Sequence, residues 1–248
     1  LGDVYKRQTY SGSGAPSVEG INFKAMKGQT IGVIGGTGSG KSSLVNLIPR
    51  LYDATQGEVL VDGVNVKDYD IEALRNKVGI VMQKAVLFKG TIRENMWMGK
   101  KGATDEQIDE ALEISQSKEF VDSKQGRLDY VIEQGGKNLS GGQRQRLTIA
   151  RAIVRKPDVL ILDDSASALD FATDAALRKA IRGMNNSPTV FIVSQRAASL
   201  MYADLIIVLD DGQVAGMGTH DELLANCEVY KEIYESQFKK ADSEGGVA

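Results

Sequence analysis

The stretch that decides the fold is Gly35-Gly36-Thr37-Gly38-Ser39-Gly40-Lys41-Ser42. It fits the pattern GxxxxGK followed by Ser or Thr, in which glycines let backbone N–H groups turn toward phosphates. The apolar residues 30–34 before it predict a buried strand, and residues 43–48 after it predict a helix. The alternative is a glycine-rich strand-to-helix turn with a chance lysine. The four glycines, the Lys-Ser pair and the two flanks together favour a site for a nucleoside triphosphate.

Two side chains and a helix start supply the polar chemistry that such a site needs. Lys41 is expected to reach the β- and γ-phosphates, and the Ser42 hydroxyl can bind Mg²⁺. The helix that continues from Ser43 contributes its positive N-terminal end. We therefore expect a nucleotide together with Mg²⁺ at this turn.

The composition is that of an ordinary globular protein. The 248 residues are 42% apolar and 25% charged, which allows a full core in one large or two small domains. The net charge of −3 does not indicate a nucleic-acid binder. Because Cys227 is the single cysteine, an internal disulfide and a multi-cysteine metal site are excluded. This fits a reducing compartment, with the thiol as a small apolar filler.

The ends of the chain and its apolar runs carry little information on function. The longest apolar runs have about five residues, far below the roughly 18 to 20 that a membrane-spanning helix needs. Residues 1–8 lack an initiator Met and an apolar signal core. We interpret them as a scar or a truncated start, and residues 239–248 as a flexible tail.

The first part of the chain favours short strands broken by turns. Strands are expected at residues 18–23, 30–34, 58–61 and 64–66. Asp62-Gly63 between the last two predicts a hairpin. A short helix at 70–75 and a buried strand at 78–82, which ends at Gln83, are expected next.

Helical signals dominate about residues 84–157. Thr104 and Gln107 match a capping box that is followed by apolar residues at helical spacing. We expect a helical subdomain inserted into a sheet domain.

Strand signals return after this helical stretch, at residues 159–162, 189–193 and 205–209. The helix-length segments between these strands predict a parallel sheet with right-handed crossovers. A hairpin at Gly212 and one last helix from about His220 complete the expected order of elements.

Asp163 follows the apolar residues 159–162 directly. A carboxylate there lies at the carboxyl end of a strand, where ligands of open α/β sheets collect. An acidic residue after a strand is common by itself. Together with the phosphate loop upstream, however, Asp163 is the natural partner of Mg²⁺.

The stretch Leu139-Ser140-Gly141-Gly142-Gln143 precedes a helical run and indicates the family. Together with the phosphate loop, Gln83, Asp163 and Ser167-Ala168-Leu169-Asp170 in that order, it resembles the nucleotide-binding domain of ATP-binding cassette (ABC) transporters. The resemblance covers essentially residues 9–237. It implies an α/β P-loop NTPase fold over residues 9–238: a RecA-like, mostly parallel sheet, an antiparallel β subdomain and the inserted helical subdomain.

In that family the phosphate loop of one domain and the LSGGQ segment of another enclose each ATP, so the resemblance implies a second nucleotide-binding domain as partner. The position of Ser140, Gly141 and Gly142 agrees with this role, because exposed N–H groups at a helix start suit a γ-phosphate. Gln143 completes the motif.

Three further positions take their roles from the resemblance. Tyr10 matches the aromatic residue that stacks on adenine, although it could also be a packing or exposed tyrosine. Gln83 matches the glutamine that approaches Mg²⁺ and relays contact with the membrane domain. Asp170 matches the aspartate that communicates between the two ATP sites, and it could equally be a helix N-cap.

Residues 86–95 and 218–224 look like the exporters, the subclass whose membrane domain is fused upstream. Glu133 lies where exporters place a loop that touches the cytoplasmic helices of that domain. The resemblance therefore implies a location at the cytoplasmic face of the plasma membrane.

Two positions depart from the family pattern. Asp164 replaces the catalytic glutamate, and Gln195 replaces the switch histidine. Aspartate is one methylene shorter, which withdraws its carboxylate by on the order of 1 Å, and a misplacement of that size can cost about 10²-fold in rate. Gln195 cannot carry a positive charge. His220, the only histidine, belongs to the second exporter-like segment and is expected to make a structural contact.

These departures give two competing hypotheses. The first is the ATPase domain of a heterodimeric multidrug or lipid exporter, in which this chain contributes the degenerate site. The second is a binding module of the same transporter that holds ATP and does not hydrolyse it. A soluble ABC protein that acts on DNA or ribosomes would need coiled-coil insertions or tandem cassettes, and the sequence contains neither.

Overall fold

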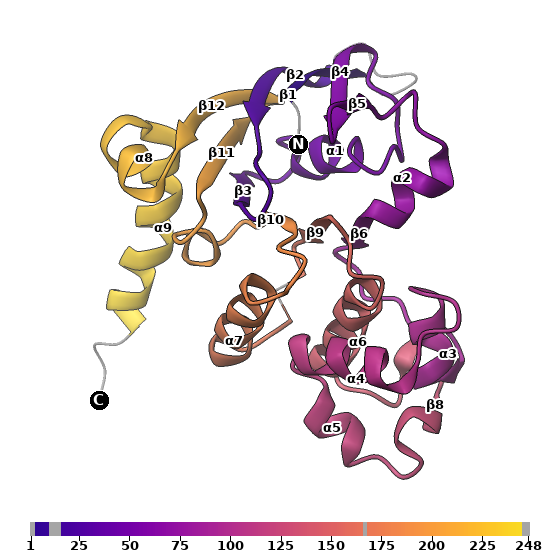
Figure 1. The fold of residues 1–248 in the computed structure, drawn as a ribbon. Helices are drawn as coiled ribbons and strands as arrows, with labels where there is room; N and C mark the ends of the chain where they lie inside the picture. Colours follow the sequence, from indigo (N-terminus) through magenta and orange to yellow (C-terminus); the bar gives the residue numbers. More distant parts are fainter. Residues whose placement is uncertain (1–2, 10–15, 166–167, 245–248) are drawn as a thin grey trace. The chain divides into compact units, whose positions relative to one another are not determined.

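The structure is a computed structural model that describes residues 3–9, 16–165 and 168–244. Its fold class is α/β. The chain divides into two compact units: Leu1–Arg75 with Thr189–Ala248, and Asn76–Pro188. Figure 1 gives the labels of the helices and strands in each unit.

A mostly parallel group of strands forms the core of the first unit. In spatial order its strands are β12 (Gln213–Gly218), β11 (Leu205–Asp210), β3 (Thr30–Gly35) and β10 (Thr189–Val193). Strand β3 pairs in parallel with both β11 and β10, whereas β12 is antiparallel to β11. All residues of β3 and β10 are buried, as expected for strands with continuous apolar runs. The predicted parallel pairing is confirmed.

The same unit contains the predicted antiparallel sheet. Its spatial order is β2 (Pro16–Lys24), β1 (Asp3–Thr9), β4 (Gln56–Val61) and β5 (Val64–Asn65). The hairpin at Asp62-Gly63 is confirmed, because Val61 pairs with Val64. The backbone of β1 pairs with β2 and β4, so this strand begins at Asp3, inside the segment 1–8 that we had placed outside the domain.

The helices of the first unit are α1 (Lys41–Asn46), α8 (His220–Asn226) and α9 (Glu228–Glu244), with a short 3₁₀ turn η3 (Ala197–Ser199). Helix α2 (Ile71–Lys77) ends just beyond the boundary of this unit. The expectation of one last helix is wrong. Cys227 takes an extended conformation (φ −123°, ψ 105°) between α8 and α9, and its buried thiol lies 3.7 Å from the Ala215 carbonyl.

The predicted tail also differs from the structure. Helix α9 continues to Glu244, five residues beyond Lys239, where the tail was expected to begin. Lys, Ala and Glu are good helix formers, and the first glycine after them is Gly245, so the local sequence supports the longer helix.

The second unit combines two parallel strands with helices. Strand β6 (Val78–Val81) pairs with β9 (Val159–Asp163), so that Val81 lies beside Leu162. The helices are α3 (Ile92–Trp97), α4 (Asp105–Ile114), α5 (Lys118–Asp122), α6 (Gly141–Ile153) and α7 (Phe171–Arg182). The predicted capping box of Thr104 and Gln107 is present at the start of α4.

Short elements interrupt the stretch that was expected to be helical. The two-residue strands β7 (Gly90–Thr91) and β8 (Val131–Ile132) form an antiparallel pair, and η1 (Arg127–Asp129) and η2 (Gln134–Gly136) are single 3₁₀ turns. Within the ranges that the structure describes, no helix combines the length and the apolar character needed to cross a membrane.

Candidate functional site

The phosphate loop connects β3 to α1. The Lys41 ammonium group donates hydrogen bonds to the Gly35 and Gly36 carbonyls at 2.9 and 2.6 Å, and it lies 3.4 Å from the Ser39 hydroxyl. Ser39 is buried, whereas Gly36, Thr37 and Gly38 are exposed. The loop therefore presents its backbone outward while the lysine lies against it.

Two glycines of the loop are required by its geometry. A Cβ at Gly35 would lie 2.1 Å from the Leu209 carbonyl oxygen, which excludes any side chain. Gly40 has φ 92° and is the N-cap of α1, and it offers no side-chain hydrogen bond to the first turn. A glycine-rich loop that leads directly into a helix start is the arrangement that binds phosphates, so the loop fits the phosphates of a nucleotide.

Gln195 comes to the same sheet edge as the phosphate loop. Val193 of β10 pairs in parallel with Val33 of β3, and the Ser194 N–H donates to the Val33 carbonyl at 3.1 Å. Gln195 is the next residue and is exposed. The chain after β10 and the loop after β3 therefore begin side by side at the carboxyl ends of parallel strands.

The second unit brings Gln83 and Asp164 together. Asp163 is the last residue of β9 and is 5% exposed, and Gln83 follows the neighbouring strand β6. The Gln83 amide Nε2 donates to Asp164 Oδ2 at 3.2 Å. Asp164 has φ 45°, in the left-handed region that aspartate tolerates better than most residues. The structure thus connects the glutamine that we expected to approach Mg²⁺ with Asp164, which stands where the resemblance expects a glutamate.

The LSGGQ segment forms the start of α6. The Ser140 hydroxyl accepts from the Gln143 N–H at 3.2 Å, and Gln143 Oε1 accepts from the Ser140 N–H at 3.1 Å. This capping box does not use the N–H groups of Gly141 and Gly142. Gly141 is exposed, and a Cβ at Gly142 would lie 3.3 Å from the Ala168 carbonyl oxygen.

Arg144 is a residue that sequence reasoning missed. Its Nη1 donates to the Leu139 carbonyl at 2.6 Å and to the Gly136 carbonyl at 3.3 Å. It therefore connects the first turn of α6 to the chain that leads into the motif, which includes the exposed Glu133. Its position directly after Gln143 is the only signal in the sequence that could have indicated this role.

Asp170 caps α7, which confirms one of its two alternatives. Its two carboxylate oxygens accept from the Thr173 N–H at 2.9 Å and from the Thr173 hydroxyl at 2.7 Å. These hydrogen bonds, the backbone one first, lower the pKa of Asp170 below its ordinary value. Two other positions that we had singled out, Tyr10 and Ser167, lie outside the described residues.

His220 makes the structural contact that we expected. Its Nδ1 lies 2.8 Å from the Tyr230 hydroxyl, and its ring packs against Tyr230 and Tyr234. Tyr230 is fully buried, and burial, with a smaller contribution from Tyr234, raises the pKa of Tyr230 to about 12. The histidine therefore helps to attach α9 to α8.

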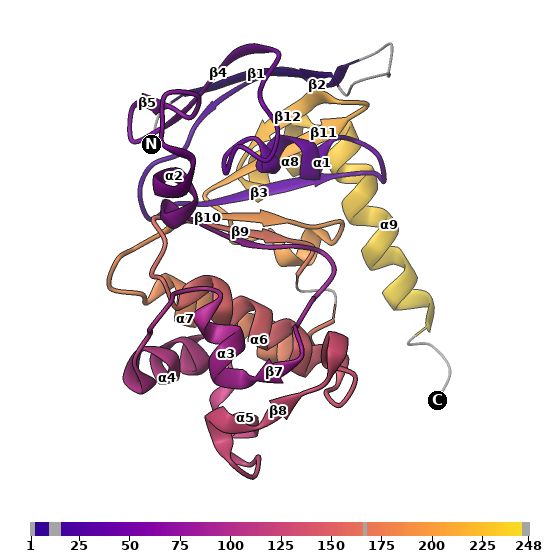
Figure 2. The same cartoon turned by 90° about the vertical axis from the view of Figure 1, so that its right-hand side faces the viewer.

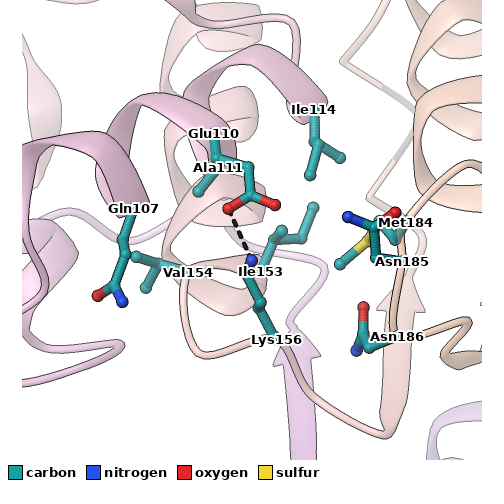
Figure 3. A pocket seen from close by; sticks show the side chains of 10 residues that line it. All are labelled: Gln107, Glu110, Ala111, Ile114, Ile153, Val154, Lys156, Met184, Asn185 and Asn186. Carbon is teal, nitrogen blue, oxygen red and sulfur yellow. Dashed lines mark ion pairs between the residues drawn. The ribbon is translucent and has the colours of Figure 1, made fainter.

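A small hollow of about 20 Å³ lies in the second unit, between α4, the end of α6 and residues 184–186 (Figure 3). Ala111, Ile114 and Ile153 contribute much of its apolar wall, and Lys156 pairs with Glu110 at 2.7 Å. No residue of the phosphate loop, of the LSGGQ segment or of the Asp163-Asp164 pair lines it, so it is separate from the candidate site.

Comparison with known proteins agrees with these motifs. A model of the family described as ABC transporter matches residues 18–167. An uncharacterized ABC transporter ATP-binding protein of Mycobacterium tuberculosis is 43% identical over 242 residues, which cover 96% of this chain and 41% of that protein. A putative multidrug export ATP-binding/permease protein of Staphylococcus aureus is 39% identical over 228 residues, which cover 92% of this chain and 39% of that protein.

A solved structure of a bacterial Atm1-family ABC exporter with ATP bound is also similar. Its TM-score is 0.89 at 30% sequence identity, over 95% of this chain and 41% of that chain. The chain thus spans less than half the length of the relatives it matches. From the family match and these relatives together, the chain belongs to the ABC transporter family, as an ATP-binding domain.

Proposed function

We propose that this domain powers an ABC exporter, and that its own nucleotide site binds ATP well and cleaves it slowly. The observation that carries the slow cleavage is the pair Asp164 and Gln195, at the positions where the family resemblance expects a glutamate and a histidine. The exporter part is supported by two relatives, which are described as a putative multidrug export protein and as an Atm1-family exporter.

In this proposal the first unit binds the triphosphate. The N–H groups of the phosphate loop and of the first turn of α1 hold the phosphates, and Lys41 exchanges its bonds to the Gly35 and Gly36 carbonyls for bonds to phosphate oxygens. Tyr10 is proposed to stack on the adenine.

The donors proposed for Mg²⁺ are Ser42, Gln83 and Asp163, whose hydroxyl, amide and carboxylate oxygens are of the kind that this ion prefers. When bound, the ion neutralises charge on the β- and γ-phosphates. Asp163 suits this role because it is a buried carboxylate at the carboxyl end of a strand.

The slow step is assigned to the geometry around Asp164. Its carboxylate is withdrawn from an attacking water by on the order of 1 Å relative to glutamate, which can cost about 10²-fold. The Gln83 amide also donates to this carboxylate at 3.2 Å, so it competes with that water for the same oxygen. Gln195 can hydrogen-bond to a γ-phosphate but adds no positive charge to it.

The proposed partner is a second ABC nucleotide-binding domain, carried by a different half-transporter. The LSGGQ segment of this chain is intact although Asp164 and Gln195 depart from the pattern. We assign that segment to the partner's ATP, which would be cleaved with the partner's own glutamate and histidine. A membrane domain fused upstream would hold the assembly at the cytoplasmic face of the membrane.

The experiment is an ATPase assay of the purified chain and of Asp164→Glu, Gln195→His and the double variant. The unchanged chain should hydrolyse ATP barely above background. The double variant should hydrolyse ATP faster than either single variant. Its fold increase in rate should exceed the product of the two single-variant fold increases, because both groups act on one water and one phosphate. Adding Lys41→Ala to the double variant gives the background rate.

Two outcomes would contradict this assignment. Rapid turnover by the unchanged chain would show that Asp164 and Gln195 suffice. A double variant that stays inert in an ATP-bound homodimer would place the defect elsewhere and favour the non-hydrolysing regulatory module. Thermal stability is measured alongside, because glutamate at the left-handed φ of Asp164 carries a backbone cost of about 1 kcal/mol.

A further inference from the structure

The backbone around Gln195 is held on the side that faces the sheet. The Ser194 N–H donates to the Val33 carbonyl at 3.1 Å, and the buried Ser194 hydroxyl accepts from the Arg196 N–H at 2.9 Å. These bonds fix where the chain leaves β10. They leave the carbonyl of Gln195 and the N–H of Ala197 to another partner.

That partner is Gln237, on α9. Its side-chain Nε2 donates to the Gln195 carbonyl at 2.7 Å, and its Oε1 accepts from the Ala197 N–H at 2.9 Å. The planar side-chain amide of Gln237 therefore binds both the C=O of Gln195 and the N–H of Ala197. Two such bonds fix the position and the orientation of the backbone that carries the Gln195 side chain.

Helix α9 is itself held firmly where it reaches this segment. It packs on η3, β11 and β12, and its Tyr230 is fully buried against His220. Figure 2 shows α9 passing alongside β11. Gln237 therefore extends from a supported helix, and Ala197, on which it acts, is also fully buried.

We propose that Gln237 is a positioning residue that aims the Gln195 side chain at the γ-phosphate. This inference rests on the proposed function, which gives Gln195 its contact with ATP. Gln237 acts through the backbone of Gln195. Without it, the peptide groups from Gln195 to Ala197 lose two hydrogen bonds, and the Gln195 side chain samples directions that miss the phosphate.

The test uses three variants of the 248-residue chain. Gln237→Leu removes both hydrogen bonds at similar side-chain size. Gln237→Glu keeps an acceptor for the Ala197 N–H but sets a carboxylate against the Gln195 carbonyl. The control is Ser236→Ala, since the Ser236 hydroxyl donates only to the Ile233 carbonyl of its own helix.

The first measurement is hydrogen exchange of the Ala197 amide without nucleotide. Loss of one hydrogen bond of ordinary strength corresponds to about a fivefold change. We expect exchange about fivefold faster in Gln237→Leu and unchanged in Ser236→Ala. An unchanged exchange rate in Gln237→Leu would show that Gln237 does not hold the Ala197 N–H, and it would overturn the inference.

The second measurement is the ratio of ATP affinity to ADP affinity, because only ATP carries the γ-phosphate. Gln237→Leu should reduce this ratio severalfold, as Gln195→Ala should, and both should leave ADP affinity unchanged. The double variant Gln195→Ala/Gln237→Leu should be no worse than Gln195→Ala alone. A purely structural role would lower the affinity for both nucleotides, or give additive effects, and either result refutes the inference.

The two proposals fail in different ways. If Gln195→Ala leaves the affinity ratio unchanged, the γ-phosphate contact is wrong, and the positioning role falls with it. If Gln195→Ala lowers the ratio and Gln237→Leu does not, the proposed function stands and only the role of Gln237 is refuted.

Discussion

Helices α1 and α6 both begin at a glycine-rich motif, but their first turns are built differently. The N-cap of α1 is Gly40, which has φ 92° and provides no side-chain cap. The N-cap of α6 is Ser140, which forms a complete capping box with Gln143. Helix α1 has six residues and α6 has thirteen.

The difference indicates what each helix start is built to do. The N-cap of α1 has no side chain that could accept from the first turn, and a glycine-capped helix start of this kind suits a bound anion. The first turn of α6 is complete in itself, with Gly141 exposed at its surface. In the proposed function, this preorganised turn would present two backbone N–H groups to a nucleotide held by another domain.

The largest effect is expected from Gly141→Asp in the assembled transporter. The new carboxylate would repel the γ-phosphate of the partner's ATP and obstruct the backbone approach, so ATPase activity should fall by about 10²- to 10³-fold. Folding should be unaffected, because the nearest atom to a Cβ at Gly141 is Arg144 Nη2 at 4.0 Å and an acidic residue suits the first turn of a helix.

Gly141→Ala is the matched control, because it adds a Cβ at the same position without adding a charge. Asp164→Asn, measured in the same assembly, should change the activity far less than Gly141→Asp does. If Asp164→Asn is equally damaging, the site of Lys41 is itself a working catalytic site, and the asymmetry between the two helix starts has no functional meaning.

The next largest effect is expected from Lys41→Ala. Removing a charge-assisted hydrogen bond to phosphate costs about 1.5–3 kcal/mol, so ATP affinity in calorimetry should fall roughly 10- to 100-fold. Lys27→Ala, at an exposed lysine in the turn before β3, is the control and should bind as the unchanged chain does. Equal ATP affinity for Lys41→Ala and the unchanged chain would show that Lys41 does not contribute to ATP binding.

The sequence was most informative where local spacing carries the chemistry. The order of strand, phosphate loop and helix is encoded in consecutive residues, and the structure has the predicted parallel strands β3, β10 and β11. The capping boxes at Thr104 and Ser140 span only four residues each, so both can be recognised from spacing alone.

The sequence could not reveal features that depend on distant contacts. Gln237 lies 42 residues from Gln195, and a glutamine on a helix has no pattern that predicts its partner. The contact between Gln83 and Asp164 spans 81 residues. The break at Cys227 also arises from tertiary contact, because the buried thiol packs near β12 and interrupts a run that favours one continuous helix.

A smaller effect is expected from removing the cap of α6. Ser140→Ala should cost about 1 kcal/mol, and Ser140→Gly only a few tenths, because glycine is tolerated at an N-cap and alanine is not. For a chain of this size, 1 kcal/mol corresponds to a fall in Tm of about 2–4 °C. Scanning calorimetry of both variants measures this. Equal Tm values for Ser140→Ala and the unchanged chain would mean that the box does not support α6.

The smallest effect concerns Asp170, whose cap on α7 adds a third kind of helix start to the comparison. Because its hydrogen bonds to Thr173 hold its pKa below the ordinary value, its carboxylate stabilises the folded state at neutral pH, and this contribution is lost as the pH falls through the lowered pKa. Asp170→Asn also caps well, so its urea midpoint should lie near that of the unchanged chain at pH 7. Between pH 4 and pH 2 the unchanged chain should lose more stability than the variant. A midpoint difference that does not vary with pH would refute the assignment of this acid loss to Asp170. If Asp170→Asn instead lowers ATPase activity in the assembled transporter at pH 7 while its urea midpoint is unchanged, the carboxylate acts in communication between the two ATP sites as well as in capping.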